Sequence, residues 1–198
     1  MGLFNKKRIL QLPNADIQYY PCFLNPVEAS TYFTVLRNTV PWQQDDITVF
    51  GKTYAQPRLT ALFGNNGKPY SYSNIVMHPH SYTDELLEIK TRLQSLTDTM
   101  FTTCLLNLYR DGKDSNGWHA DDEKELGPNP TIASISLGEE RIFHLRHKND
   151  KSLKHKIRLE HGSLLLMRGE TQHYWQHQIP KTALKIGERI NLTFRVID

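Results

Sequence analysis

Two stretches in the first half of the chain carry apolar residues at helical spacing. Intervals of three and four residues predict one helix from about 26 to 39 and another over roughly 82 to 97. The apolar stripes consist of Ala29, Phe33, Leu36 and Val40 in the first helix and of Leu86, Ile89, Leu93 and Leu96 in the second. Asn25, Pro26 and Glu28 have the form of a helix start, with a cap, a first-turn proline and a glutamate that reaches back. Such stripes are typical of helices that pack on a larger layer, which we expect to be a sheet.

From about residue 102 onward the pattern changes to short segments rich in Leu, Ile, Thr and aromatic residues, broken by Gly, Asn, Asp and Pro. The expected strands are 103–110, 131–137, 141–147, 155–160, 163–168, 173–178 and 189–196. Many short strands in succession favour a sandwich or a jelly roll.

A hairpin is expected earlier, within 46–63, where residues 47–50 lead through Gly51 and Lys52 into a second strand. We therefore predict an α+β fold. Its core is a jelly roll (a double-stranded β-helix) over 99–198, and residues 1–98 form an extension of helices and a hairpin, packed with the core as one compact unit.

The composition is that of an ordinary soluble protein. The 198 residues suffice for one sizeable domain, and 38% of them are hydrophobic. No stretch approaches the roughly 20 consecutive apolar residues of a membrane helix, and the first residues lack the apolar core of a secretory signal. The two cysteines are too few for a disulfide framework. We expect an intracellular monomer in the cytoplasm or the nucleus or nucleoid, with no membrane contact.

The charge balance permits a nucleic-acid partner without demanding one, because the formal net charge is only +3. One segment, however, is almost uniformly basic, with Asp150 as its single acid. Its basic residues and histidines are Arg141, His144, Arg146, His147, Lys148, Lys151, Lys154, His155, Lys156 and Arg158. A solvated hairpin is the simpler explanation of such a run, and a strip that follows a phosphate backbone is the functional one.

A candidate metal site lies in the second half of the chain. His119 and Asp121 are two residues apart, so on a strand or its end both side chains leave the same face. A third ligand would come from another predicted strand, where His177 and His173 are both candidates on the same face. Two histidines and one carboxylate form the facial ligand set of non-haem Fe(II) oxygenases. A His-x-Asp pair alone is weak evidence, since the chain contains nine histidines.

Two arginines close to the end of the chain suit an anionic partner. Arg189 and Arg195 are six residues apart, so both point to one side of the predicted strand, with Asn191 and Thr193 between them. An inward arginine is costly unless it is paired, and a dicarboxylate co-substrate would pair with it. Outward-facing arginines are the alternative, which the alternation with Phe194 makes less favourable. Asn107 and Tyr109, also two apart, lie on a predicted strand and are candidates for further hydrogen bonds.

These motifs follow one another in a fixed order between about 100 and 198. They are Asn107-Leu108-Tyr109, Trp118-His119-Ala120-Asp121-Asp122-Glu123, Ser134-Ile135-Ser136, Arg146-His147-Lys148, His177 and the run from Arg189 to Arg195. The set resembles the AlkB family of Fe(II)/2-oxoglutarate dioxygenases. The resemblance implies a jelly-roll core and an iron site formed by His119, Asp121 and His177.

The resemblance also implies the reaction. 2-Oxoglutarate would bind the iron with its distal carboxylate paired to Arg189, and O₂ would be the oxidant. The residues implied around the co-substrate are Asn107, Tyr109, Arg189, Asn191, Thr193 and Arg195, and the catalytic set is His119, Asp121, His177 and Arg195. The expected activity is direct-reversal repair of alkylated DNA: 1-methyladenine and 3-methylcytosine would be demethylated, with release of formaldehyde, succinate and CO₂.

The first half of the chain narrows the resemblance to members that repair duplex DNA, because three of its segments look like a nucleotide-recognition lid. The implied substrate contacts are Phe50, Gly51, Lys52, Arg58, Tyr70, Ser71, Tyr72, Asp122, Glu123, Arg146 and Lys148. Phe50 at the hairpin tip would probe the base stack, although it could equally pack down onto the domain. Tyr72 and His119 would sandwich the flipped base.

Charge gives the remaining contacts their expected roles. Arg58, Arg146 and Lys148 would hold phosphates, and Asp122 and Glu123 would attract cationic lesions. Three alternatives stay open: a demethylase of RNA or single strands with the same core, a lesion-binding module without turnover, and a protein hydroxylase. The last would leave the Phe50 hairpin and the basic strip unexplained.

Overall fold

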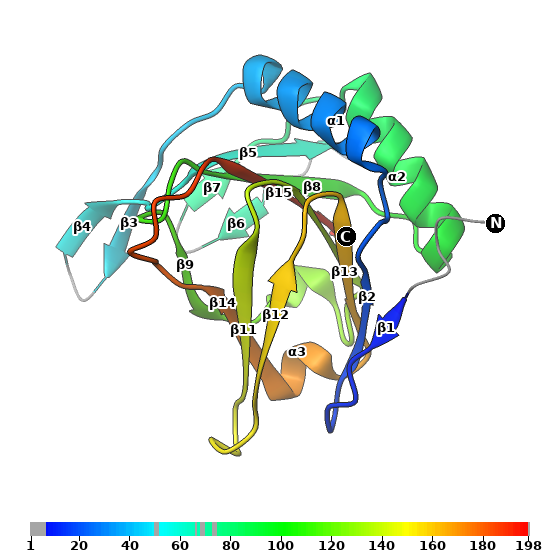
Figure 1. Cartoon of the computed structure of the whole chain (residues 1–198), viewed down its shortest axis with the longest axis vertical. Coiled ribbons are helices and arrows are strands. Elements are labelled where there is room, and N and C mark those ends of the chain that lie inside the picture. The colour runs from blue at the N-terminus through cyan, green and yellow to red at the C-terminus, as the bar shows by residue number, and fades with distance from the viewer. Residues whose placement is uncertain (1–6, 50–51, 66, 68–69, 73–74, 198) are drawn as a thin grey trace.

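The computed structural model describes residues 7–49, 52–65, 67, 70–72 and 75–197, without the side chains of 48, 49, 70–72 and 75. Two antiparallel sheets lie face to face, and two helices cover the outer face of the larger sheet (Figure 1). Two stacked antiparallel sheets with non-sequential strand order form a jelly roll, as the sequence predicts.

The larger sheet has seven strands in the order β1-β2-β13-β10-β15-β8-β5. Their bounds are β1 (Arg8–Ile9), β2 (Asp16–Tyr20), β5 (Leu59–Gly64), β8 (Thr103–Tyr109), β10 (Ile132–Gly138), β13 (Ser163–Arg168) and β15 (Arg189–Arg195). The smaller sheet has four strands in the order β12-β11-β14-β9. Their bounds are β9 (Asn116–His119), β11 (Arg141–His147), β12 (Lys154–Leu159) and β14 (Trp175–Ile179).

Strand β8 shows how one sequence serves both faces of the larger sheet. All seven of its residues are buried. Leu106 and Leu108 belong to the core beneath the helices, whereas Leu105 and Tyr109 belong to the core between the two sheets. Because neighbouring side chains on a strand point to opposite faces, Asn107 shares the inner side with Leu105 and Tyr109. The inner face of β8 therefore carries polar groups into the space between the sheets.

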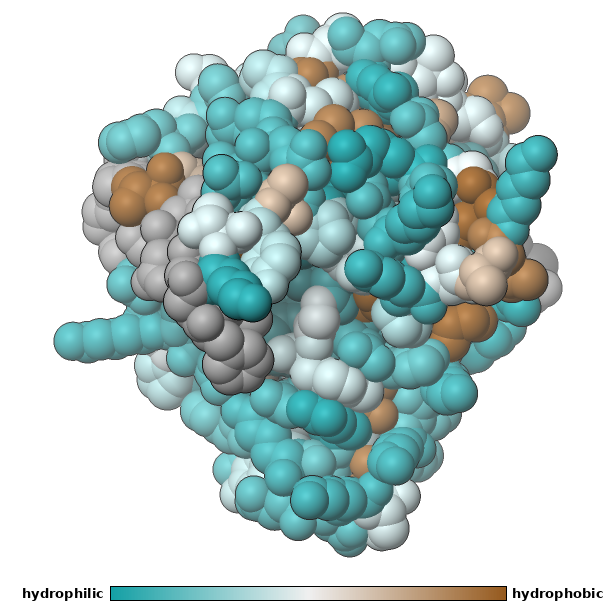
Figure 2. Space-filling model, turned by 90° about the vertical axis from the view of Figure 1, so that its left-hand side faces the viewer, coloured by the Kyte–Doolittle hydropathy of each residue, from teal (hydrophilic) through white to brown (hydrophobic). Residues whose placement is uncertain are grey.

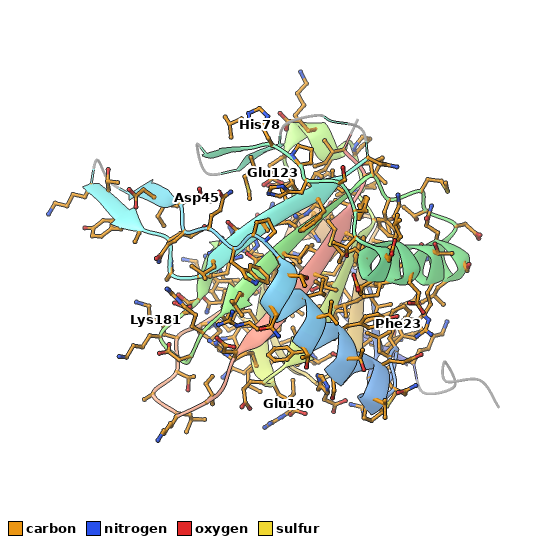
Figure 3. All side chains as sticks on the ribbon, turned by 90° about the horizontal axis from the view of Figure 1, so that it is seen from above. Phe23, Asp45, His78, Glu123, Glu140 and Lys181 are labelled. Atoms are coloured by element: carbon orange, nitrogen blue, oxygen red, sulfur yellow. The ribbon has the colours of Figure 1, made fainter. Side chains whose placement is uncertain are left out.

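Helices α1 (Pro26–Thr39) and α2 (Asp84–Thr97) lie side by side over the larger sheet (Figure 3). The predicted start of α1 is confirmed, since the Asn25 side chain accepts hydrogen bonds from the first turn and Glu28 accepts one from the Asn25 amide. Glu28 also forms an ion pair with Arg92 of α2, at 2.9 Å, which joins the two helices. No helix in the described part of the chain is long and apolar enough to cross a membrane.

Two short hairpins stand apart from the sheets, and the one predicted within 46–63 is confirmed. Their strands are β3 (Asp46–Val49) with β4 (Lys52–Ala55), and β6 (Tyr70–Tyr72) with β7 (Ile75–Met77). The β3–β4 hairpin projects from one side of the molecule (Figure 1). Phe50 and Gly51, which lie between β3 and β4 in the sequence, are outside the described residues.

The structure departs from the predicted elements in the second half of the chain and at the sheet edges. The predicted strand 173–178 begins as a short helix, α3 (Thr171–Tyr174), and β14 starts only at Trp175. The sequence pattern does not predict β9, nor the single 3-10 turn Lys124–Leu126 that follows it. Strands β1, β2 and β5 also come from the segment expected as an extension, so this segment completes the larger sheet.

We expect Glu28→Gln to lower the free energy of unfolding at neutral pH by roughly 1 kcal/mol, because a neutral amide weakens both the cap and the ion pair. The hydrogen bond from Arg92, followed by that from the Asn25 amide, lowers the pKa of Glu28 below its ordinary value of 4.5. The stabilisation is therefore fully present above pH 4.5 and is lost as the pH falls through the lowered pKa.

Urea unfolding of wild type and variant across this pH range should give stabilities that converge in acid. A difference that stays constant with pH would contradict the role given to the charge of Glu28. Glu125→Gln, on an exposed residue, is the control and should behave as wild type.

Candidate metal centre and co-substrate pocket

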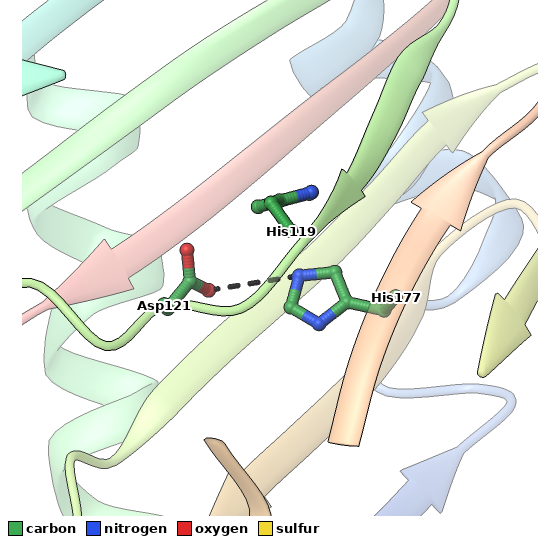
Figure 4. Close-up of side chains that lie close together, drawn as sticks. All are labelled: His119, Asp121 and His177. Atoms are coloured by element: carbon green, nitrogen blue, oxygen red, sulfur yellow. Dashed lines mark ion pairs between the residues drawn. The ribbon is translucent and has the colours of Figure 1, made fainter. Parts of the chain in front are cut away.

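Three predicted metal ligands meet in the space between the sheets. His119 is the last residue of β9, Asp121 follows two residues later, and His177 lies in the middle of β14. Strands β9 and β14 pair with His119 directly opposite His177. The ligand atoms of the three residues lie within 4.8 Å of one another (Figure 4). The structure thus brings together two histidines and one carboxylate, the donor set that suits non-haem Fe(II).

His173 does not join this cluster. It lies on α3, its side chain is exposed, and its Nε2 is hydrogen-bonded to Asn129 Oδ1 at 2.9 Å. The expectation that His173 shares a strand face with His177 is wrong, because the chain changes from helix to strand at Trp175.

The backbone sets the tautomer of His119. Its Nδ1 lies 2.8 Å from the carbonyl oxygen of Gly117, which can only accept, so Nδ1 carries the hydrogen. The lone pair is therefore left on Nε2, the atom that faces the cluster and lies 3.3 Å from Asn116 Nδ2. In metal-binding histidines, a hydrogen bond from the ring nitrogen that does not bind the metal, here the one to Gly117, orients the ring.

Asp121 is held in place from two sides. Its side chain is buried, and its Oδ1 accepts a hydrogen bond from Arg195 at 2.6 Å. Its backbone amide donates to Gln172 Oε1 at 2.9 Å. The other carboxylate oxygen, Oδ2, then faces His177 Nε2 at 3.9 Å. Asp121 is thus oriented toward the centre of the cluster before any ion binds.

Burial for the histidines and local charges for Asp121 keep all three residues in the form that a metal requires. Burial alone would raise the pKa of Asp121, but the charge of Arg195 and the two histidines outweighs it and lowers the pKa to about 2. Burial, followed by the charge of His119, lowers the pKa of His177 to about 3. Burial also lowers the pKa of His119. At neutral pH the cluster therefore offers one carboxylate and two neutral imidazoles, which need lose no proton to bind a cation.

Arg189 has the burial, the charge and the open donors that are needed to bind a carboxylate inside the protein. Its side chain is fully buried, and Nη2 donates to Ser136 Oγ at 2.8 Å. Nε and Nη1 are buried as well, and neither has a hydrogen-bond partner among the described residues. Burial lowers the pKa of Arg189 to about 10, so the group is still charged at neutral pH. A buried guanidinium with two open N–H groups fits one carboxylate of a dicarboxylate co-substrate.

The predicted co-substrate residues and the metal ligands line one pocket. Among its lining residues are Asn107, Tyr109, His119, Asp121, His177, Arg189, Asn191, Thr193 and Arg195. The side chains of two of these residues already form hydrogen bonds to other groups of the protein. Asn191 Nδ2 donates to Ser134 Oγ and to the Ile135 carbonyl, and its Oδ1 accepts from Thr193 Oγ1. Asn191 and Thr193 therefore shape the pocket wall and have less capacity left for a ligand.

Arg58 is buried and has partners inside the protein. It is only 4% exposed, and its Nε donates to Asn107 Oδ1 at 2.7 Å while Nη1 donates to the Ser115 carbonyl at 3.2 Å. A guanidinium enclosed in this way lines the pocket, and the phosphate contact expected of it stays a prediction. Arg58 fixes the orientation of the Asn107 amide, whose Nδ2 is left as the donor.

Two of the predicted substrate contacts bind each other. Lys148 Nζ donates to Asp122 Oδ2 at 2.8 Å, and half of the Asp122 side chain is exposed. The two charges offset one another, which reduces the attraction of a cationic lesion expected from Asp122. Glu123, the next residue, is half-buried near the start of the turn Lys124–Leu126 (labelled in Figure 3).

The basic strip divides into buried and exposed residues. Arg141 and His147 are buried and point inward from β11. Arg146 points outward, lies over the Trp118 ring at 4.2 Å and donates twice to Gln176 Oε1. On β12, Lys154, Lys156 and Arg158 are exposed. The exposed part of the run is compatible with both explanations, a solvated hairpin face and a strip that contacts phosphates.

The lid contacts are described only in part. Lys52 begins β4 and is exposed, whereas Phe50 and Gly51 lie outside the described residues. For β6 the backbone is described, and the side chains of Tyr70, Ser71 and Tyr72 lie outside the described part. Their predicted roles, including the sandwich of Tyr72 and His119, stay predictions.

Two residues that position the site, Gln172 and Ser136, have no role assigned from the sequence. Gln172 is buried on α3 and accepts the hydrogen bond of the Asp121 amide from 51 positions away, a contact without any sequence signal. Ser136 accepts from Arg189. It had a usable signal, because Ser134 and Ser136 alternate with apolar residues on a buried strand and so share one face.

Comparison with known proteins agrees with the fold and the donor set. The model of the 2OG-Fe(II) oxygenase superfamily matches residues 16–195. Alpha-ketoglutarate-dependent dioxygenase alkB homolog 3 of Bos taurus is 43% identical, over 89% of this chain and 64% of that protein. DNA oxidative demethylase ALKBH2 is 39% identical in Arabidopsis thaliana and 35% in Homo sapiens, where the match covers 90% of this chain and 72% of that protein.

The solved structure of OsALKBH1 superposes with a TM-score of 0.68, at 18% identity, over 95% of this chain and 100% of that one. It supports the fold class at the level of architecture. The chain spans 63–65% of the length of the alkB homolog 3 proteins that it matches.

We expect a divalent metal such as Co(II) to raise the melting temperature of the metal-free protein, by roughly 5–10 °C at a hundredfold excess over its dissociation constant. His177→Ala should abolish this rise, because it removes one of three ligands. His173→Ala is the matched control and should keep the full rise. An unchanged rise in the His177 variant, or its loss in the His173 variant, would refute the ligand assignment.

Proposed function

Because the chain belongs to the AlkB family of the 2OG-Fe(II) oxygenase superfamily, we propose that it removes alkyl groups from the bases of nucleic acid by oxidation. The substrates that we propose are 1-methyladenine and 3-methylcytosine in DNA inside the cell, with the protein acting as a monomer. One observation carries the proposal: the His119-Asp121-His177 cluster and the two open N–H groups of Arg189 share one pocket.

Different residues of the pocket would bind the metal cation and the anionic co-substrate. His119, Asp121 and His177 would hold Fe(II), and Arg189 would bind the distal carboxylate of 2-oxoglutarate. Together with O₂, these groups would supply the oxidation of an N-methyl group, with succinate, CO₂ and formaldehyde as products. Arg195 keeps Asp121 ionised and oriented, and Arg58 leaves the Nδ2 of Asn107 as a donor toward the pocket.

The surface around the lid supports a nucleic-acid substrate. The side of the molecule that carries the β3–β4 hairpin is mostly hydrophilic, with apolar residues only in small, separate patches (Figure 2). Lys52 on this hairpin and the exposed lysines of β12 can contact phosphates without reading sequence. The relatives named DNA oxidative demethylase make DNA the first candidate.

Lesion charge would provide selectivity. Both proposed lesions are cationic, and a carboxylate close to the pocket would favour them over the neutral parent bases. We assign this attraction to Asp122 and Glu123, which directly follow the ligand Asp121, with a smaller share from Asp122 because Lys148 offsets its charge. A damaged base that cannot pair also costs less to flip out of a duplex, which adds to the discrimination.

The test is the formaldehyde released from an oligonucleotide that carries one 1-methyladenine, with Fe(II), 2-oxoglutarate and ascorbate. We expect release by wild type and a loss of more than about a hundredfold in His177→Ala, because a ligand is missing. The same sequence should be offered as duplex DNA, as single-stranded DNA and as RNA. The ratio of the three rates decides between the duplex enzyme and the single-strand or RNA alternative.

Two outcomes would contradict the proposal in different ways. Succinate formed without formaldehyde would mean that the co-substrate is used and that the substrate class is wrong, as for a protein hydroxylase. Tight binding of the methylated duplex without succinate or formaldehyde would identify a lesion-binding module without turnover.

A further inference from the structure

A buried arginine outside the pocket ties together the loops that border it. Arg141, the first residue of β11, is only 4% exposed. Its guanidinium donates to the carbonyl oxygens of Asp111 at 3.3 Å, Asp114 at 3.0 Å and Pro180 at 2.6 Å. All three acceptors are neutral backbone groups, and they come from two loops far apart in sequence.

These two loops connect the strands that carry the site. The loop over 110–115 joins β8 to β9, and the loop over 180–188 joins β14 to β15. A backbone hydrogen bond from Thr182 to Gly112 joins the loops once more, at 2.8 Å. Arg141 therefore anchors the loop that follows Tyr109 and the end of β14, and Tyr109 is the residue that pairs with Arg189 in the larger sheet.

The Tyr109 ring connects Arg141 to Arg189. The Cζ atom of Arg141 lies 5.7 Å from the ring centroid, and that of Arg189 lies 5.2 Å from it. Neither arginine forms an ion pair with a carboxylate of the described residues, since the nearby Asp114 carboxylate is bound by Arg110 at 2.7 Å. Two buried positive charges thus share one aromatic ring, and among the described residues only Arg141 has carboxylates nearby, those of Asp111, Asp114 and Glu139, none of them in a direct ion pair with it.

This arrangement is costly for the protein alone. A buried charge without a counter-charge is destabilising, and a cation next to an aromatic ring recovers only part of that cost. Burial lowers the pKa of both arginines, and the charge of Arg141 lowers the pKa of Arg189 further. The two charges are close enough to repel each other, and over a similar distance Arg141 would attract an anion bound by Arg189.

We propose that Arg141 is a positioning residue for the co-substrate: it holds Tyr109 and Arg189 in place and adds a second buried positive charge that favours a 2-oxo acid with a distal carboxylate. The inference rests on the proposed binding of 2-oxoglutarate by Arg189. It adds a determinant of co-substrate selectivity at a residue that lies outside the pocket lining and that the sequence places only in the basic strip.

A purely structural Arg141 would behave differently. If it only closed the two loops, its replacement would disturb the whole pocket and weaken every 2-oxo acid alike. A charge aimed at the distal carboxylate weakens only the acid that carries this group. 2-Oxopentanoate has the same carbon chain as 2-oxoglutarate without the distal carboxylate, so the pair of acids separates the two roles.

The experiment is calorimetric titration of the Fe(II)-loaded protein with each acid in the absence of O₂. Arg141→Gln removes the charge and still offers a hydrogen-bond donor to the loop carbonyls. We expect it to weaken 2-oxoglutarate by about tenfold and 2-oxopentanoate by less than about twofold. Arg141→Lys keeps the charge and should retain most of the preference for 2-oxoglutarate.

Three results would overturn the inference: equal weakening of both acids in the glutamine variant, unchanged binding of 2-oxoglutarate in it, or a lysine variant that loses the preference. The lysine variant decides the matter by itself if the glutamine variant does not fold. Arg189→Met separates this inference from the proposed function. If Arg189→Met binds 2-oxoglutarate as tightly as wild type, the pocket assignment itself is refuted. If Arg189→Met binds it more weakly but Arg141→Gln binds it as wild type does, only the role of Arg141 is refuted.

Discussion

The register of the larger sheet is the constraint on which the site depends. Strand β15 lies between β10 and β8, and the pairing places Asn191 between Ser136 and Asn107. Because side chains alternate along a strand, a slip of one residue would turn Arg189 toward the helices and bring Ile190 into the pocket. The burial of Ile190 in the core beneath the helices holds the register. Packing on one face of the sheet therefore decides the chemistry on the other.

The same sheet also shows how the protein tolerates buried charge. Asp121 and Arg195 offset each other at 2.6 Å, and such a pair contributes little net stability in a dry interior. Arg189 and Arg141 have no such partner among the described residues, so they lower the stability of the protein without its co-substrate. Two apolar cores, one on each side of the larger sheet, offset this cost. The binding pocket is built at the expense of stability, as is common for functional sites.

Features that depend on neighbouring residues can be predicted from this sequence, whereas contacts between distant segments cannot. The helix over 26–39, the fold class and the ligand spacing of His119 and Asp121 follow from short periodic patterns, and the structure agrees. The family resemblance is likewise confirmed by the family model and the relatives. The sequence could show it because each motif is a short run of neighbouring residues. Strand β9 is missed because four residues containing Asn and Gly show no strand pattern. The burial of Arg58 is missed because its partner Asn107 lies 49 residues away.

The central position of β15 also constrains how the chain can fold. Its two neighbours, β10 and β8, are made earlier during synthesis, yet they are joined only through β15. Until residues 189–195 have been delivered, the two halves of the larger sheet expose unpaired strand edges, which are prone to wrong association. The strand that carries Arg189 thus closes the sheet as well as the pocket. A chain that stops short of it lacks both the strand that joins the two halves of the sheet and the arginine of the pocket.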